Sequence, residues 1–332
     1  MKKPLAFLLI GVLALSWLVL PVTGCDNAGV DQDEQEHKDV FSIYLLAEKI
    51  EGGLPDDLAS LKLQEEPWLS VEDIDYYDFS THYIYLKEDK TSLFGRGLQN
   101  QMYSDFVVVA DDERCYLGRF HPLFSSQMPM TPIISDYPGF ELSPEDVISI
   151  TYPFRAESTE DLRNDPRILN ALAQAGKLSL GVSVALKDVQ VNSQDGITDV
   201  IYTFTVTNES DEPLYVPDPD KMGISLFHYY TGGIILYGSE IYSTVLSEYD
   251  PSVAPQSYDS WDNSWFTRLD SHESMERTLT FDSDQIVSDG NYSCRLRYTG
   301  PSYIEKEDRT LSGGRLWIGT VETNIVEIST GS

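Results

Sequence analysis

The chain of 332 residues carries three thiols that could take part in redox or metal chemistry, those of Cys25, Cys115 and Cys294. None forms the CxxC spacing that is typical of redox and zinc sites. Cys294 alternates with Tyr292 and Leu296, which predicts that its side chain points into a core. An oxidising compartment would permit a bridge between Cys115 and Cys294. We favour the interpretation that they are two separately buried thiols.

Nucleophilic serine chemistry and histidine-based metal chemistry are not indicated. The segment Gly181-Val182-Ser183-Val184-Ala185 falls one residue short of the GxSxG pattern and lies in a predicted strand, whereas that pattern works at a strand–helix turn. Metal binding by histidine needs spaced groups. The histidines are scattered singly, and we interpret them as surface or structural residues: His37, His82, His121, His228 and His272.

Calcium is the one cofactor that the acidic residues leave open, and otherwise no cofactor is predicted. Asp218 and Asp220 occupy positions 1 and 3 of a loop that resembles an EF-hand and has Gly223 at position 6. Met222 at position 5 and Tyr229 at position 12 break the motif, because position 12 requires a bidentate Glu. A calcium site of another kind at Asp218 and Asp220 stays open. A second acidic cluster consists of Asp73, Asp75 and Asp78.

Aromatic residues gather in the long segment from Tyr237 to Phe266. Long connections without regular structure tend to be functional or disordered, and aromatic residues mixed with Ser and Asp are typical of recognition surfaces. One interpretation is a binding surface for an envelope protein or a glycan, formed by Tyr249, Tyr258, Trp261 and Trp265. Trp261 is then expected to be exposed. The alternative is that Trp265 and Phe266 begin the next strand and fill the core.

The first element to place is the N-terminal segment. Lys2 and Lys3 precede an uncharged run, Leu5 to Leu20, and Pro21 with small residues follows it before Cys25. This order resembles the lipobox of bacterial lipoprotein precursors. The resemblance implies that residues 1–24 are a cleaved signal peptide and that the Cys25 sulfur carries lipid, so that the membrane is a partner through this anchor. The alternative is an uncleaved spanning helix, which needs about 20 apolar residues.

Residues 25–39 follow as an acidic, flexible tether without apolar periodicity. Asp26, directly after the cysteine, resembles the signal that retains lipoproteins in the inner membrane of Gram-negative bacteria. The chain is therefore predicted to lie outside the cytoplasm, anchored to the cell membrane. Its formal net charge of −31 excludes a nucleic-acid partner, because phosphate binding needs clustered Lys and Arg.

Residues 40–176 are predicted to form a small α+β domain. Apolar runs at 40–46 and 83–86 read as strands, and residues 106–110 and 115–120 flank a polar turn as in a β-hairpin. Ser70 and Asp73 have the spacing of a helix cap. One helix is bounded by Asp165 and Pro166 at its start and by Gly176 at its end. The proline-rich stretch 121–145 is expected to be an irregular loop.

Residues 177–332 are predicted to be an all-β sandwich, because short alternating segments recur between turn residues. The expected strands include 178–186, 200–206, 224–230, 234–237, 275–281, 291–298 and 315–328. The segment Asp289-Gly290-Asn291-Tyr292 resembles the tyrosine corner of immunoglobulin-like domains, although the inter-sheet disulfide of that family is absent. The arrangement also resembles that of uncharacterised secreted bacterial proteins that pair an α+β domain with a sandwich, and this resemblance transfers no site.

The favoured function is a non-catalytic binding or structural role of an envelope lipoprotein. Two alternatives come from other classes: an extracytoplasmic hydrolase with a carboxylate-based site in the first domain, and an acidic cation-binding protein. Two facing carboxylates buried in the largest pocket would favour the hydrolase. An exposed aromatic patch within residues 237–266 would favour binding.

Overall fold

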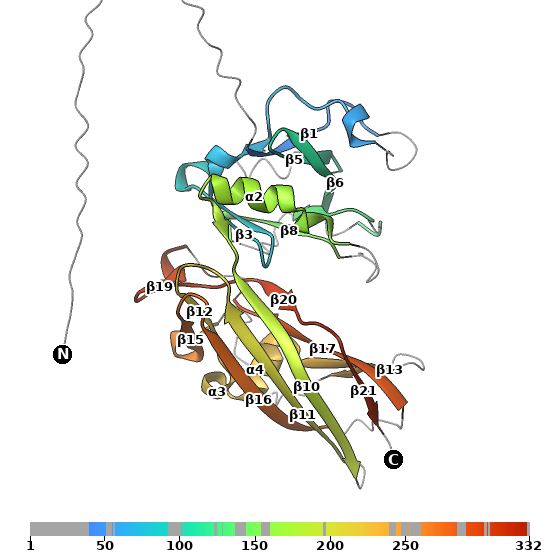
Figure 1. Ribbon diagram of the computed structural model, residues 1–332, viewed down its shortest axis with the longest axis vertical. Helices are drawn as coiled ribbons and strands as arrows, with labels where there is room; N and C mark the ends of the chain where they lie inside the picture. Colours follow the sequence, from blue (N-terminus) through green and yellow to red (C-terminus); the bar gives the residue numbers. More distant parts are fainter. Residues whose placement is uncertain are drawn as a thin grey trace, which may run out of the picture. The chain divides into compact units, whose positions relative to one another are not determined.

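The structure is a computed structural model, which describes residues 40–50, 55, 57–91, 101, 103–122, 125–127, 129–136, 144–153, 160–194, 197–238, 244–246, 252, 260–283, 290–301, 304 and 306–330 (Figure 1). This part of the chain is mostly β, as predicted. Within it, no helix is long and apolar enough to cross a membrane. The predicted signal segment, the tether and Cys25 lie outside the described residues.

Strands from residues 41–179 form one mixed sheet, here called the N-terminal sheet. Its order is β2-β1-β5-β6-β7-β8-β4-β3-β9, with β6–β7 and β3–β9 parallel and the other pairs antiparallel. The strands are β1 (Phe41–Leu45), β2 (Leu69–Ser70), β3 (Ile74–Asp78), β4 (Tyr83–Leu86), β5 (Asp105–Ala110), β6 (Glu113–Pro122), β7 (Ile133–Asp136), β8 (Val147–Thr151) and β9 (Leu178–Ser179).

The predicted hairpin is confirmed as β5 and β6. Asp111 and Asp112 form its turn with φ of 52° and 64°. Two successive residues with positive φ match the twist of paired strands, and Asp tolerates this conformation better than most residues. Ser70 and Asp73 also interact as predicted, because the Asp73 carboxylate accepts hydrogen bonds from the Ser70 backbone N–H and hydroxyl.

Helix α2 (Pro166–Gln174) confirms the predicted helix. The Asp165 side chain accepts from the Arg167 backbone N–H, Pro166 opens the first turn, and Gly176 follows the end with a φ of 65°. The helix lies against one face of the N-terminal sheet (Figure 1), and its buried residues Ile168, Ala171 and Leu172 belong to the core of that sheet. The prediction of an irregular loop at 121–145 was wrong for residues 133–136, because Ile133 and Ile134 are buried in β7 between β6 and β8.

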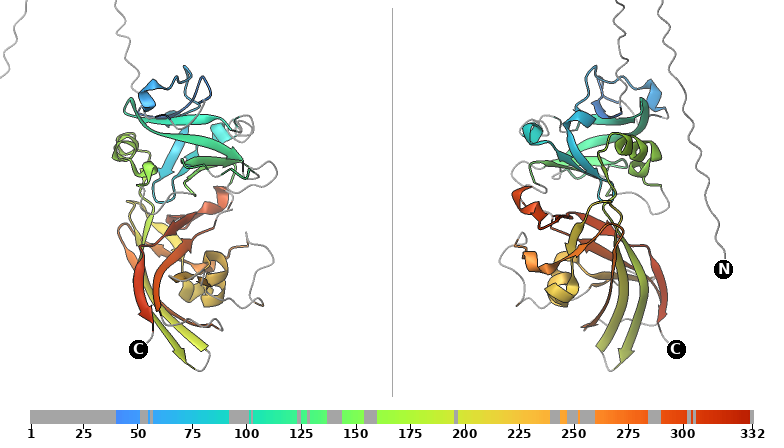
Figure 2. Two further views of the ribbon diagram at one scale, coloured as in Figure 1. Left: turned by 90° about the vertical axis from the view of Figure 1, so that its right-hand side faces the viewer. Right: turned by 60° about the vertical axis from the view of Figure 1, so that its left-hand side comes forward.

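Strands from residues 182–330 form the remaining sheets. A long antiparallel group contains β10 (Val182–Gln194), β11 (Ile197–Asn208) and β16 (Ser274–Ser283) (Figure 2). A second sheet has the order β15-β12-β19-β18, with β12 (Leu214–Pro217), β15 (Phe266–Leu269), β18 (Thr310–Leu311) and β19 (Gly314–Leu316). A third contains β13 (Ile234–Gly238), β14 (Thr244–Leu246), β17 (Gly290–Thr299), β20 (Thr320–Glu322) and β21 (Val326–Thr330).

The prediction that this part is purely β was wrong at residues 219–231. The predicted strand 224–230 is helix α4 (Ile224–Thr231), preceded by the short helix α3 (Pro219–Met222). Asp218 caps α3 with Pro219 at its first position, and Gly232 ends α4 with a φ of 73°. Short apolar runs fit a buried helix as well as a strand, so periodicity alone did not separate them.

Helix α4 contributes to the core that the strands of residues 182–330 share. The Phe227 ring stacks on Phe204 of β11, with centroids 5.8 Å apart, and lies 6.0 Å from Tyr298 of β17. All three rings are fully buried. The helix therefore fills space between strands that belong to different sheets.

Candidate functional site

The predicted aromatic surface is not exposed where the structure describes it. Trp261 is half-buried, and its ring lies 4.0 Å from Tyr230 and 5.7 Å from Phe266. Trp265 is also half-buried and ends a 3₁₀ turn directly before Phe266 opens β15. The expectation that Trp261 is exposed was therefore wrong, and the core-filling alternative describes Trp265 and Phe266 better than an exposed surface does. Tyr249 and Tyr258 lie outside the described residues.

Asp218 and Asp220 hold an arginine in place. Asp218 is buried, and its two carboxylate oxygens accept from Arg277 at 2.8 and 2.7 Å. The Thr267 hydroxyl donates to the same carboxylate, and Asp220 lies 2.9 Å from Arg277. These carboxylates are thus occupied by protein donors. Among the described residues, no group of three or more His, Cys, Asp or Glu has the geometry of a metal site.

Two of the described histidines, His82 and His228, contact buried tyrosine hydroxyls. The His82 Nδ1 lies 3.1 Å from the Tyr77 hydroxyl, and burial lowers the pKa of His82 to about 3. The His228 Nε2 lies 2.8 Å from the Tyr202 hydroxyl. His272 is exposed, whereas His121 is buried, in a strand of the N-terminal sheet. Cys115 and Cys294 are free thiols.

A cleft of about 900 Å³ lies between residues of β3, α2 and β9 on one side and the loop 209–213, β18 and β19 on the other. Its lining combines apolar, hydroxyl and acidic side chains with one arginine. The lining residues that matter here are Asp75, Tyr76, Leu178, Ser179, Leu180, Glu209, Ser210, Asp211, Glu212, Leu311 and Arg315. None of them belongs to the predicted site, except that Asp75 lies in the second acidic cluster.

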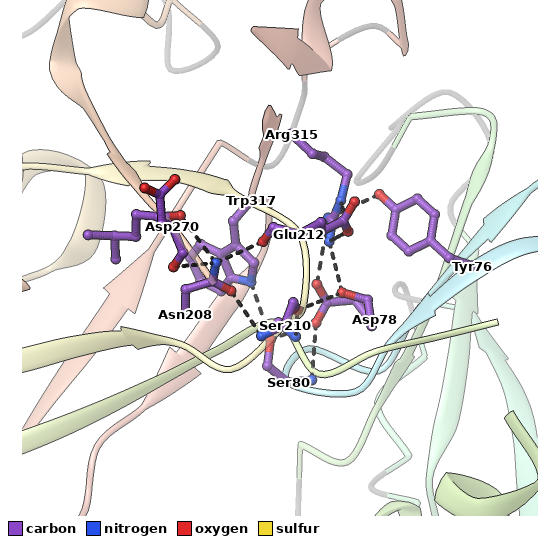
Figure 3. Close-up of polar contacts among 12 residues, drawn as sticks. Tyr76, Asp78, Ser80, Asn208, Ser210, Glu212, Asp270, Arg315 and Trp317 are labelled. Carbon is purple, nitrogen blue, oxygen red and sulfur yellow. Dashed lines mark hydrogen bonds and ion pairs between the residues drawn. The ribbon is translucent and has the colours of Figure 1, made fainter. Parts of the chain in front are cut away.

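Asn208, the last residue of β11, shapes one wall of this cleft. Its buried side-chain amide donates to the backbone carbonyls of Glu212, Leu269 and Asp270, and its side-chain oxygen accepts from the Ser210 N–H (Figure 3). The Ser210 hydroxyl in turn accepts from the Gly181 N–H at 2.8 Å. A fully paired buried amide fixes a loop firmly. Residues 209–213 are thereby held at the edge of the cleft.

Arg315 is one of the residues that line the cleft, and its contacts join the N-terminal sheet to the β12–β19 sheet (Figure 3). Its guanidinium contacts Glu212 at 2.8 and 2.9 Å and donates to Ser179 at 2.9 Å and to the Tyr76 hydroxyl at 3.2 Å. It also lies over the Tyr76 ring, 4.4 Å from the centroid. Only 12% of the Arg315 side chain is exposed, and each of its nitrogens has an acceptor closer than Asp78.

Asp78 lies behind Arg315 and is fully buried. Its Oδ1 accepts from the Ser80 N–H at 3.0 Å and the Ser80 hydroxyl at 2.6 Å, and the Trp317 indole N–H donates to the same hydroxyl (Figure 3). Its Oδ2 is 3.8 Å from Arg315 and has no hydrogen-bond partner among the described residues. Burial raises the pKa of Asp78, against the lowering effect of the Arg315 charge and of hydrogen bonds from Ser80 and Thr81.

A second buried arginine joins the same two parts of the chain. Arg309 makes a bidentate contact with Asp146, at 2.8 and 2.6 Å, and both side chains are almost fully buried. The Tyr85 ring lies between Arg309 and Arg315, 5.7 and 6.0 Å from their guanidinium carbons, and stacks on Tyr76 at 4.0 Å. Burial raises the pKa of Tyr85 far above its ordinary value. The tyrosine therefore stays neutral between two cations.

The charges of the cleft favour a cationic ligand. Arg315 is compensated by Glu212 and Asp78, so the remaining charged groups on the lining are the carboxylates of Asp75, Glu209 and Asp211. Leu180 is 39% exposed there, which adds an apolar surface. Two facing buried carboxylates, the geometry that would favour a hydrolase, are not found among the described residues that line this cleft.

Sequence reasoning missed this site because its residues come from distant segments. Tyr76 and Arg315 are 239 positions apart. One signal was present in the sequence: Arg315 directly precedes the apolar run Leu316-Trp317-Ile318, in a chain with only 23 basic residues. A cation next to a buried run is expected to have a partner, because an unpaired buried charge is costly. The sequence gives no means of naming that partner.

Comparisons with known proteins leave the family open. No protein-family model matches the sequence, and no curated protein matches it. Six chains of solved structures match. One is the X-ray structure of Northeast Structural Genomics Consortium target SoR45, with 11% sequence identity and a TM-score of 0.22; the match covers 45% of this chain and 83% of that chain. Similarity at this level carries no argument about fold or function.

Proposed function

We propose that the chain is a lipid-anchored, extracytoplasmic lipoprotein of the cell envelope with a binding role, and that the cleft lined by Arg315 is its binding surface. The lipobox-like order of residues that ends at Cys25 supports the lipid anchor and the extracytoplasmic location. In this proposal residues 40–176 form an α+β domain and residues 177–332 an immunoglobulin-like sandwich, in which α3 and α4 are insertions. The cleft between these two parts is the observation that carries the binding role.

The ligand that this cleft suits is a positively charged group with a short apolar part, such as a basic peptide segment. The three acidic side chains on the lining attract the charge, while Leu180 and Leu311 offer apolar contact. Pockets commonly combine an apolar lining with a few polar groups that orient the ligand. The loop fixed by Asn208 keeps the wall in place before binding, which reduces the entropy lost on association.

Binding is tested with a fluorescein-labelled, end-blocked peptide of alternating lysine and leucine. We expect the double variant Asp75→Asn/Asp211→Asn to bind it roughly 3- to 10-fold more weakly, since each exposed charge pair contributes up to about 1 kcal/mol. The matched control is Glu65→Gln/Glu66→Gln, which removes the same charge at exposed positions away from the lining. Equal affinities of the two double variants, measured by fluorescence anisotropy, would rule out the cleft as the cation site.

The anchor is tested separately in cells of a bacterium that processes lipoproteins. We expect a fatty-acid probe to label the wild-type chain and to leave Cys25→Ala unlabelled, because the thioether needs the Cys25 sulfur. Cys294→Ala serves as the control, because it removes a buried thiol and should keep the label. A wild-type chain as free of label as the Cys25→Ala variant would remove the lipoprotein proposal.

A further inference from the structure

Two carboxylates share one guanidinium at the junction between the N-terminal sheet and the β12–β19 sheet. Glu212 is half exposed and takes the close contacts with Arg315, at 2.8 and 2.9 Å. Asp78 is fully buried. Its Oδ2 lies 3.8 Å from the Arg315 Nη1, which is too long for a hydrogen bond. The more deeply buried of the two anions is therefore the less well compensated.

Among the described residues, Arg315 of β19 is the cation that acts on Asp78. The titratable neighbours of Asp78 are tyrosines of β3 and β4 whose pKa values are raised, mainly by burial, so that they stay neutral: Tyr76, Tyr77, Tyr83 and Tyr85. From β9 and the start of β10 the neighbours are uncharged. The Gly181 Cα lies so close that an added Cβ would stand 2.3 Å from the Asp78 Oδ1. The carboxylate cannot gain solvent without separating these elements.

We propose that Asp78 is a proton-dependent latch between the two parts of the chain, which holds them more firmly when it binds a proton. A proton from solvent on the Oδ2 removes the charge that burial penalises. Protonation of Asp78 costs Arg315 little electrostatic stabilisation, because the guanidinium has Glu212, Tyr76 and Ser179 as closer acceptors. This latch does not depend on which ligand occupies the cleft.

The sign of the pH dependence follows from linkage. Because the pKa of Asp78 is raised above its value in the unfolded chain, the native state binds the proton more tightly. The resulting stability is complete below the ordinary pKa of Asp, about 3.9, and is lost as the pH rises through the raised value. A carboxylate held mainly by its arginine would show the opposite trend.

The test is urea unfolding of the full chain and of Asp78→Asn between pH 8 and pH 5. Other acids titrate in both proteins, so their effect cancels in the ratio of the two folding constants. We expect the wild-type constant to rise relative to that of the variant as the pH falls, by up to about tenfold per pH unit between the two pKa values of Asp78. A ratio that stays constant, or that falls with the pH, would overturn the latch.

Two further measurements keep the outcome clear. Asp146→Asn removes the other buried carboxylate of the junction, which has two close contacts with Arg309. Relative to this variant, the wild-type folding constant is not expected to rise as the pH falls. Hydrogen exchange of the wild type needs no variant: corrected for intrinsic rates, residues 79–86 and 314–319 should be better protected at pH 5 than at pH 8, relative to β10 and β11. Equal protection at both pH values would contradict the proposal even if Asp78→Asn does not fold.

Discussion

At the scale of single residues, Gly181 shows how closely the two parts of the chain approach each other. It has a φ of 70°, and an added Cβ would lie 2.1 Å from the Ser80 hydroxyl. Gly319 has a φ of 110°, and a Cβ added there would lie 2.7 Å from the Thr81 side chain. The turn between β3 and β4 therefore fits only against residues without a side chain.

Gly181→Ala is expected to destabilise the protein more than Gly176→Ala does. Both glycines have a positive φ, which costs an alanine about 1–2 kcal/mol. Nothing lies within 4 Å of a Cβ at Gly176, so the second variant measures the backbone cost alone. The crowding at Gly181 should add about 1–3 kcal/mol in urea unfolding. Equal losses for the two variants would mean that the Ser80 turn moves away at little cost.

At the scale of secondary-structure elements, the sequence predicted what is encoded locally. The hairpin of β5 and β6 and helix α2 depend on a turn and on caps within a few positions, and both were found where the sequence indicated. Helix α4 was taken for a strand, because its apolar run is buried on most of its surface and has no clear period. Asp218, which caps the preceding helix α3, was considered for a calcium loop instead, since the same acid suits either role.

Pairing between distant segments could not be predicted in this way. The parallel pairs β3–β9 and β12–β19 bring together residues about 100 positions apart. The cleft and the Arg315 contacts depend on these pairs, because β3, β9, β19 and the loop that leads into β12 supply their residues. Composition and periodicity describe each strand by itself, so they predicted a β-rich chain and left the candidate site unlocated.

At the scale of the whole described chain, residues 40–179 and 182–330 are joined by buried ions in addition to apolar contacts. Arg309 and Asp146 are 163 positions apart, and their exposed fractions are 6% and 9%. Taking two charges out of water is costly, and their attraction repays that cost only when the geometry is good. The bidentate contact meets this condition. If one part unfolded alone, the other would keep either Asp146 or Arg309 without its partner. We therefore expect the two parts to unfold together.

Asp146→Ala tests this coupling. It leaves the Arg309 guanidinium buried without its carboxylate, so we expect a loss of about 3–5 kcal/mol in the free energy of unfolding. Glu48→Ala is the control: Glu48 pairs with Lys62 at the surface, with both side chains more than 70% exposed, and a loss below about 1 kcal/mol is expected.

The double variant Arg309→Met/Asp146→Leu should recover most of the stability, because apolar residues of similar size remove both charges at once. Circular dichroism and tryptophan fluorescence should report one common transition for the wild type. A double variant no more stable than Asp146→Ala would show that the contact provides packing or backbone hydrogen bonds, such as that from Arg309 to the Ile304 carbonyl, more than charge compensation.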